Sequence, residues 1–323
     1  MLPAPSIIVE WETGQEGHGD RAGACLAELN RQMWAERSAF SAPPELILVF
    51  DPDQAPRGSV EAAAAGLDWP GRFEIAEAPA GCDYYGKKNF GFRRSSGEVA
   101  LFFDSDLAPE PGWLRALVEP LADPGRNVAV GRTHFETGTV YERAMALFWI
   151  FDERLEVAKV RPTRRLVSNN IAFRRRLFEA LPFPDRPTYR GQCSELGAKL
   201  ARLGIVMFEA TAARAAHPAP AGPRAFAARA FRAGRDSCAY RRMEGAVGAL
   251  DWFGEWRRDL GSVRRRIGWR APRIGAGPAA RSAAALLGAL YYSIKAAGYI
   301  SETARGRARS GPEPAAGPSP SGR

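Results

Sequence analysis

Short apolar runs alternate with stretches of helical spacing through the first two hundred residues. The runs are rich in β-branched and aromatic residues and are bounded by Gly, Pro or Asp, which is typical of buried strands. Between the first two runs, Leu26, Leu29 and Met33 recur at helical spacing. Strands this apolar have no solvent-exposed face, which predicts an α/β domain with a mainly parallel sheet covered by helices. The predicted strands are 6–11, 45–50, 72–78, 98–106 and 127–136.

Acidic residues stand where several of these predicted strands end. They are Glu10, Glu12, Asp51, Asp104 and Asp106. In open α/β sheets of the nucleotide-binding kind, ligands bind outside the carboxyl ends of the strands. We therefore expect the site at this edge of the sheet, and its acidity suits a bound metal ion.

The stretch GEVALFFDSDLAPEPGWL, 97–114, is the strongest single feature of the chain. An apolar strand runs directly into Asp104-Ser105-Asp106, so two carboxylates two residues apart emerge at the end of the strand. Mg²⁺ prefers few carboxylates together with phosphate oxygens, which this pair and a diphosphate supply together. A plain turn after a strand would have the same sequence, so the wider context has to decide between the two.

The composition changes near residue 222. The formal net charge is +9, and the excess lies in one segment, because 222–281 contains fourteen arginines and five acids. We predict a nucleotide-binding domain at 1–221, a basic helical segment capable of membrane association at 222–304, and a disordered low-complexity tail at 305–323.

Within the basic segment, 282–300 has nineteen residues and one charge, Lys295. Its length is near that of a bilayer span, but its many Ala and Gly residues make it only weakly apolar. We favour a helix that lies on an anionic membrane surface or packs on the domain over one that spans. Arginines with nearby tryptophans also suit nucleic acid, but nucleic acid offers an apolar helix nothing to bury against, so we expect no such partner. The remaining interpretation of the arginines is that they form a solvated helix face with no binding partner.

The cysteines and the N-terminal stretch bear on the compartment. Four scattered cysteines form no CxxC pair, and the first residues have neither a basic region nor a long apolar region. We expect a reducing, cytoplasmic location, with a peripheral position on the cytoplasmic face of the membrane as one form of it.

Several stretches carry a family resemblance. In order and spacing they resemble family 2 glycosyltransferases over roughly residues 5 to 220. The resemblance implies a GT-A fold, a nucleotide-diphosphate sugar donor, and inverting transfer to a hydroxyl of a lipid-linked or glycan acceptor. The matching stretches are SIIVEWE, ELILVFDPD, YYGKKNFGFRRSSGEVALFFDSDLAPEPGWL and SNNIAFRRRLFEALPFPDRPTYRGQCSELGAKLARLG.

The resemblance also implies donor-binding residues. Asp51 matches the acidic position that contacts the base or ribose, although the acid that usually precedes it is Phe50 here. Lys88 matches a basic position near the donor phosphates, and its alternative interpretation is a solvated surface lysine. Asp104 matches the first acid of the DxD motif, directed toward the ribose. Glu10, at the end of the first strand, is a further donor-binding candidate.

The resemblance implies a metal site for Mg²⁺ or Mn²⁺. Asp106, with Asp104, matches the metal-binding part of the DxD motif, and a cation that bridges the diphosphate stabilises the charge that grows as the sugar leaves. His217 matches a position where some GT-A enzymes add a histidine ligand, and a loop histidine without that role is the alternative. Asn169 and Asn170 match a polar turn beside the donor sugar and the acceptor, or else cap a turn.

The acid that family members use as a general base is missing from this chain. Their usual Glu-Asp pair is replaced by Gln192 and Cys193, whereas Glu195 agrees. Cysteine is a poor replacement for a carboxylate as the general base, because its pKa is ordinarily near 8.5. Three explanations stay open: Glu195 or Cys193 takes the role, another carboxylate such as Asp185 or Glu10 approaches, or the acceptor is already ionised, as a lipid phosphate is.

Two functions follow from these features. The first is a metal-dependent glycosyltransferase that moves a sugar from a nucleotide donor to a lipid or glycan acceptor. The second is a degenerate relative that binds a nucleotide sugar or a partner without turnover, which the altered 192–193 pair favours.

Overall fold

The computed structural model describes residues 1–11, 18–151, 154, 157, 159–186, 188, 191–243, 245 and 250–309. The strands are β1 (Pro5–Glu10), β2 (Glu45–Phe50), β3 (Phe73–Glu77), β4 (Val99–Asp104), β5 (Ala108–Pro109), β6 (Val128–Phe135), β7 (Val160–Thr163), β8 (Asn170–Arg174) and β9 (Met207–His217). The helices are α1 (His18–Glu36), α2 (Arg57–Ala63), α3 (Tyr84–Arg94), α4 (Trp113–Val118), α5 (Val140–Phe148), α6 (Arg175–Ala180), α7 (Gln192–Arg202), α8 (Gly222–Met243), α9 (Asp251–Arg270) and α10 (Pro278–Arg309). Two short 3₁₀ helices are η1 (Arg37–Ala39) and η2 (Glu119–Ala122).

The strands form one sheet in the order β3-β2-β1-β4-β8-β6-β9-β5, with β7 paired to β9. The first four strands in this order are parallel, and β8 runs antiparallel between β4 and β6. The sheet is therefore α/β and mostly parallel, as the apolar runs predict. Its register sets Glu10 of β1 directly beside Asp104 of β4, so the two acids share the carboxyl edge of the sheet.

Both faces of the sheet are buried, which explains why its strands lack a polar face. Within β1, Ile7 and Val9 pack into a core beneath α1 and α4, while Ile8 packs into a second core with α3, α6 and α7. Alternate side chains of a strand point to opposite faces, so a strand covered on both sides must be apolar throughout.

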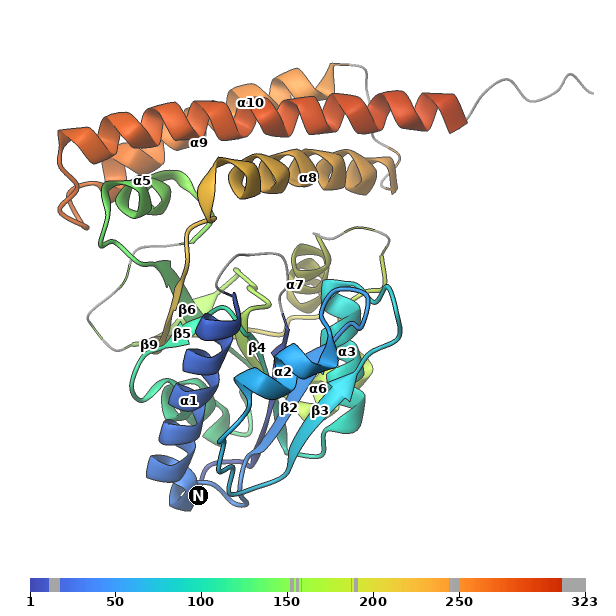
Figure 1. Ribbon diagram of the computed structural model, residues 1–323, viewed down its shortest axis with the longest axis vertical. Coiled ribbons are helices and arrows are strands. Elements are labelled where there is room, and N and C mark those ends of the chain that lie inside the picture. Colours follow the sequence, from blue (N-terminus) through green and yellow to red (C-terminus); the bar gives the residue numbers. More distant parts are fainter. Residues whose placement is uncertain are drawn as a thin grey trace, which may run out of the picture.

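A layer of helices lies over the carboxyl side of the sheet (Figure 1). Helix α10 packs on α8, α9 and α5, and a third apolar core fills the space between them. A Cβ atom on Gly234 of α8 would overlap the backbone of Lys295, and one on Gly298 would overlap the backbone of Phe231. The two glycines therefore allow α8 and α10 to pack backbone against backbone.

Charged side chains also hold this layer together. Lys295, the one charge in the weakly apolar segment, pairs with Glu255 at 2.9 Å and Asp259 at 2.8 Å on α9. Arg266 and Arg270 of α9 donate hydrogen bonds to carbonyls at the end of α5. Some basic side chains of the segment thus form ion pairs and hydrogen bonds within the protein.

Helix α10 has the length and composition of a membrane span over Pro278–Arg305, but a third of that span's best apolar window is buried against other helices. The helix continues to Arg309, so it overlaps the first residues of the predicted low-complexity tail. The rest of the predicted tail, 310–323, lies outside the described residues.

Candidate functional site

Four acidic residues from the sequence prediction lie at the carboxyl edge of the sheet. Glu10 ends β1, Asp51 follows β2, Asp104 ends β4, and Asp106 stands two residues beyond it. All four are at most 5% exposed. Glu12, the fifth predicted acid, lies outside the described residues. Adjacent parallel strands bring them together, because the carboxyl ends of such strands meet at one edge.

Helix α3 supplies two buried lysines to this edge. Lys88 Nζ lies 2.6 Å from Asp104 Oδ1, and Lys87 forms an ion pair with Glu10. Lys88 is fully buried, so its interpretation as a solvated surface lysine is wrong. A buried charge needs a partner of opposite sign, and Glu10 and Asp104 each have a lysine.

The sequence of helix α3 explains its position at this edge of the sheet. Asp83 caps its first turn by accepting a hydrogen bond from Gly86 N. Gly91 lies against β1 and β2 so closely that a Cβ atom would overlap Ile8 and Val49. The helix therefore approaches the sheet closely enough for its lysines to reach the strand ends.

Tyr84 completes the surroundings of Asp104. Its hydroxyl donates to the Asp104 carboxylate at 2.9 Å, and its Oη lies 3.2 Å from Ser168 Oγ. Burial, with the charge of Asp104 beside it, raises the pKa of Tyr84 well above its usual value. The tyrosine stays protonated and serves as a hydrogen-bond donor.

A cavity of about 410 Å³ opens in front of Asp104, and we call it the strand-end cavity. It is bounded by the end of β4, the loop before β8, the start of α7 and the first helix of the C-terminal layer. Aromatic, hydroxyl, amide and cationic groups face it, a mixture suited to a polar ligand with an apolar part. Its lining includes Tyr84, Tyr85, Asp104, Arg165, Ser168, Asn169, Cys193, Ser194, His217 and Arg229.

The predicted metal residues are only partly together. His217 Nε2 lies 3.5 Å from Asp106 Oδ2, with both side chains buried, whereas Asp104 is held by Lys88 and Tyr84. Within the ranges that the structure describes, no group of three or more His, Cys, Asp or Glu residues is arranged to hold a metal. Asp106 and His217 fit a hard cation that takes its other ligands from phosphate and water.

Asp51 sits in a turn that it organises itself. Its carboxylate accepts hydrogen bonds from the backbone N–H of Asp53 at 3.0 Å and of Gly81 at 3.3 Å, and from the Gln54 amide at 2.8 Å. It lies at the carboxyl end of β2, separate from the strand-end cavity. Glu10 likewise does not line the cavity; it pairs with Lys87 and lies beside Asp104 in the strand register.

The two asparagines of the predicted polar turn have different positions. Asn169 lines the strand-end cavity, but Asn170 is fully buried. The Asn170 amide accepts from Trp113 Nε1 at 2.9 Å and donates to the Ala213 carbonyl at 3.1 Å. The prediction of Asn170 as a donor-binding residue is therefore corrected: both ends of its amide are used to hold β8 in the core.

The start of α7 differs from the prediction in another way. Glu195 turns away from the strand-end cavity and pairs with Arg186 at 2.6 Å, and that hydrogen bond lowers the pKa of Glu195. Gln192 is buried and donates to the Thr188 carbonyl. Cys193 does face the cavity, beside Tyr85. Glu195 is thus a poor candidate for the general base, because a helix turns about 100° per residue and carries position 195 off the face of 193.

Sequence reasoning missed several groups at the cavity. Tyr84 and Tyr85 come from α3, Arg165 from the loop after β7, and Arg229 from α8. The paired tyrosines just before the two lysines were the one available signal, because Tyr84 and Lys88 lie on one face of a helix at a spacing of four.

Comparisons with known proteins agree with this geometry. Residues 18–181 match the family model of glycosyl transferase family 2. No curated protein matches the chain by sequence. A mannosyltransferase from Pyrobaculum calidifontis, solved with GDP-Man and Mn²⁺, has a TM-score of 0.58 at 14% identity over 93% of this chain and 88% of that one. TarS 1–349 of S. aureus with UDP-GlcNAc has a TM-score of 0.51 at 12% identity over 94% and 92%. At such identities the likeness shows the fold, which is that of GT-A glycosyltransferases.

Proposed function

Because this chain belongs to glycosyl transferase family 2, we propose that it moves a sugar from a nucleotide-diphosphate sugar to an acceptor, with inversion at the sugar. The observation that carries the proposal is the Asp104 carboxylate. It stands at the mouth of the strand-end cavity with Lys88 and Tyr84 bound behind it. One of its oxygens thereby keeps a fixed direction, as recognition of a ribose or sugar hydroxyl requires.

The chain's own residues have separate roles in this proposal. Asp104 accepts hydrogen bonds from hydroxyls of the donor, and Asp51 lies where a base or ribose would extend along the sheet edge. Asn169 and Ser168 offer polar contacts to the sugar on the cavity wall. Tyr85 supplies an apolar ring on which a sugar face can pack.

Asp106 and His217 are the residues that would hold a divalent cation. Mg²⁺ or Mn²⁺ bound there would balance the negative charge of the leaving diphosphate. The mannosyltransferase from P. calidifontis was solved with Mn²⁺, which supports testing that ion first.

A second candidate is binding of a nucleotide sugar without turnover. It is favoured by the start of α7, where Gln192 is buried among backbone carbonyls and Glu195 is paired with Arg186. Among the described residues that line the strand-end cavity, Asp104 is the one carboxylate, and it already has a lysine partner. Among these described lining residues, a neutral acceptor hydroxyl would then find no unpaired carboxylate to act as its base.

We also propose that the helical layer docks on an anionic membrane surface. Leu286, Leu290 and Ile300 of α10 are exposed, at 71%, 48% and 44%. Arg257, Arg258, Arg264 and Arg265 of the adjacent α9 are exposed as well. Apolar side chains that enter the interface and arginines that meet lipid phosphates support a helix lying on the membrane.

A donor panel tests the main proposal. We expect the full chain with Mn²⁺ to bind one of the UDP-, GDP- or dTDP-sugars and to transfer its sugar to an amphiphilic acceptor. Binding without transfer or slow donor hydrolysis would favour the second candidate. Absence of binding to every nucleotide sugar would contradict both.

A further inference from the structure

A second cavity, of about 270 Å³, adjoins the strand-end cavity on the side of the helical layer, and we call it the interlayer cavity. Ile150, Gly191 and Ser194 line both cavities, so the two spaces meet at the start of α7. The rest of the lining comes from α8, α9, α10 and the residue that follows α5. Resting on the proposed function, we propose that the interlayer cavity binds a neutral sugar unit of a glycan acceptor.

The junction between the two cavities depends on a glycine. Gly191 has a φ of 113°, in the left-handed region that favours glycine, and a Cβ atom there would lie 2.9 Å from the ring of Tyr240 on α8. The absence of a side chain therefore allows the Tyr240 ring to lie against the start of α7. The helical layer thus contributes to the lining directly beside the strand-end cavity.

Aromatic rings cluster in the lining of the interlayer cavity. The ring centroid of Tyr291 lies 5.7 Å from that of Trp149 and 5.3 Å from that of Tyr292. Trp149 also has a buried Nε1–H that meets no hydrogen-bond acceptor among the described residues, and buried donors are normally satisfied. Aromatic rings pack on the C–H groups of a pyranose, and the indole N–H favours a polar ligand beside them.

Hydroxyl and carboxylate groups complete the lining. Ser194 stands in the first turn of α7, and Asp236 and Ser237 are neighbours on α8. A carboxylate has about four acceptor positions, so Asp236 is able to accept from sugar hydroxyls as well as from the protein. A sugar needs both kinds of surface, because its ring has apolar C–H faces and its hydroxyls lose water on binding.

The charged groups of the lining favour an uncharged ligand. Lys295 is the one cation among the described residues that line the interlayer cavity, and it is paired with Asp259 at 2.8 Å and with Glu255 at 2.9 Å. An anionic ligand would compete with both carboxylates for the lysine and would be repelled by them. The chemistry therefore favours a neutral sugar over a phosphate or a uronic acid.

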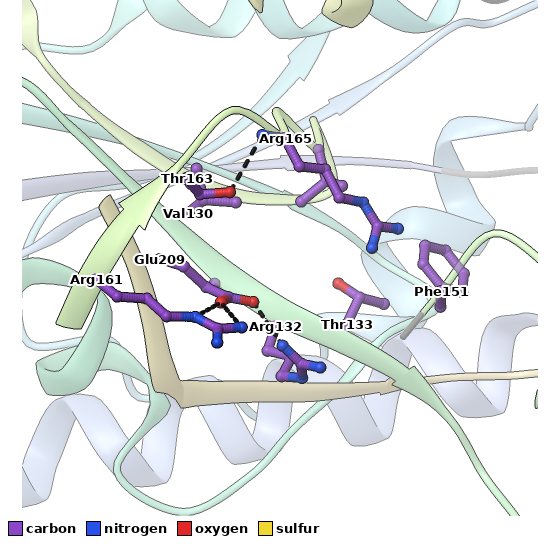
Figure 2. A pocket seen from close by; sticks show the side chains of 10 residues that line it. Val130, Arg132, Thr133, Phe151, Arg161, Thr163, Arg165 and Glu209 are labelled. Carbon is purple, nitrogen blue, oxygen red and sulfur yellow. Dashed lines mark hydrogen bonds and ion pairs between the residues drawn. The ribbon is translucent and has the colours of Figure 1, made fainter. Parts of the chain in front are cut away.

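The other neighbouring cavity, of about 110 Å³, is less suited to a neutral sugar (Figure 2). Its lining includes Arg132 of β6, Arg161 of β7 and Glu209 of β9. The register of β6 on β9 is irregular between Val130 and Arg132, and both Arg132 and Arg161 donate to Glu209 at 2.6 Å. These charged groups already pair with one another across three strands, so a neutral ligand would gain little from them.

Binding of neutral disaccharides to the full chain, measured by saturation-transfer NMR, tests the proposal. The probes are cellobiose, maltose, mannobiose and N,N′-diacetylchitobiose. Ser237→Phe places a ring in the interlayer cavity, and we expect the affinity for the best-bound disaccharide to fall by at least about tenfold, since overfilling a packed site is costly. The matched control is Ala228→Phe, which is exposed on the opposite face of α8 and should bind as the wild type does.

A second variant keeps the size of the side chain. Asp236→Asn should lower the disaccharide affinity by roughly fivefold, because hydrogen bonds to a charged acceptor are stronger than those to a neutral one. Equal disaccharide affinity in the wild type and in both cavity variants would overturn the proposal. Tighter binding of a glucuronic-acid disaccharide than of every neutral probe would overturn it as well.

Nucleotide-sugar affinity, measured in parallel, separates this proposal from the proposed function. We expect that affinity to be unchanged in all three variants. Its loss in both cavity variants, but not in Ala228→Phe, would assign the interlayer cavity to the donor and overturn the proposal. A wild type that binds a nucleotide sugar but none of the disaccharides would also overturn it. A wild type that binds a disaccharide but no nucleotide sugar would instead count against the proposed function.

Discussion

Lys88 Nζ lies 2.6 Å from Asp104 Oδ1, and the lysine has no exposed surface. The ring of Tyr84 packs on the ammonium group at 4.4 Å from its centroid, while the tyrosine hydroxyl binds the same carboxylate. The Asp104 carboxylate is therefore held in place by two side chains of helix α3. This arrangement leads to the first of five predictions.

Lys88→Met should destabilise the fold strongly, because it leaves the Asp104 carboxylate buried without its cation. Removing one partner of a buried ion pair costs about 3 to 5 kcal/mol, and we expect a loss of that size in the free energy of unfolding, measured with urea. Lys199→Met on the exposed face of α7 is the control, with an expected change within about 0.5 kcal/mol. Similar small losses in both variants would show that the pair contributes little.

Asp106→Asn should weaken Mn²⁺ binding and transfer, because the variant removes the charge that faces His217. We expect roughly a hundredfold fall in transfer rate, the size that loss of one electrostatic contact to a developing charge produces. Mn²⁺ binding is followed separately by electron paramagnetic resonance. Asp68→Asn, on the surface, should change neither quantity. Mn²⁺ affinity that is unaltered in Asp106→Asn would remove this residue from the metal site.

Glu195→Gln should leave the transfer rate within about twofold of wild type. The side chain pairs with Arg186 outside the strand-end cavity, and a partly exposed pair contributes about 0 to 1 kcal/mol to stability. The rate as a function of pH should keep its shape in the variant. Loss of an acidic limb from that profile, together with a large fall in rate, would restore Glu195 as the base.

Glu110 should make the stability depend on pH in the acid range. Burial raises its pKa, but hydrogen bonds from Arg154, Arg214 and His134 outweigh burial and lower the pKa from 4.5 to about 2. The unfolded chain therefore binds the proton first as the pH falls. The stabilisation is present above about pH 4.5 and is lost as the pH drops toward 2.

The measurement for Glu110 is the free energy of unfolding at pH 7, 5, 4 and 3. Glu110→Gln should be less stable than wild type at pH 7, and the difference should shrink at pH 3. Glu119→Gln, an exposed glutamate nearby, should follow the wild-type curve. A difference that is constant across this range would contradict the assignment.

The exposed leucines of α10 should contribute to membrane docking. Leu286→Ser with Leu290→Ser removes two side chains that would each gain about 1.5 to 3 kcal/mol on burial, so flotation with phosphatidylglycerol vesicles should fall at least tenfold. Leu203→Ser, an exposed leucine after α7, serves as the control. Vesicles of phosphatidylcholine alone should bind wild type weakly, since the arginines then lack a net negative surface. Unchanged flotation of the α10 variant would show that this face of α10 does not contact the membrane.

The sequence alone determined five strands of the nine-stranded sheet and placed the candidate acids at one edge of it. The five predicted strands occur as β1, β2, β3, β4 and β6, because a strand buried on both faces has to be apolar throughout, and that pattern is local. It also put Asp104 and Asp106 at the end of β4, since a strand that runs into polar residues ends there.

The tertiary structure decided what each side chain meets. Nothing local distinguishes a surface lysine from Lys88, whose burial results from the close approach of α3 to β1 at Gly91. Asn169 and Asn170 are neighbours in sequence, yet Asn169 lies in the turn before β8 and lines the cavity, whereas Asn170 begins β8 and is buried in the core. Arg132, Arg161 and Glu209 come from three strands, so their meeting depends on register and on an irregularity in β6. Contacts between distant segments follow from packing of the whole chain, and a periodic pattern within one segment carries no information about them.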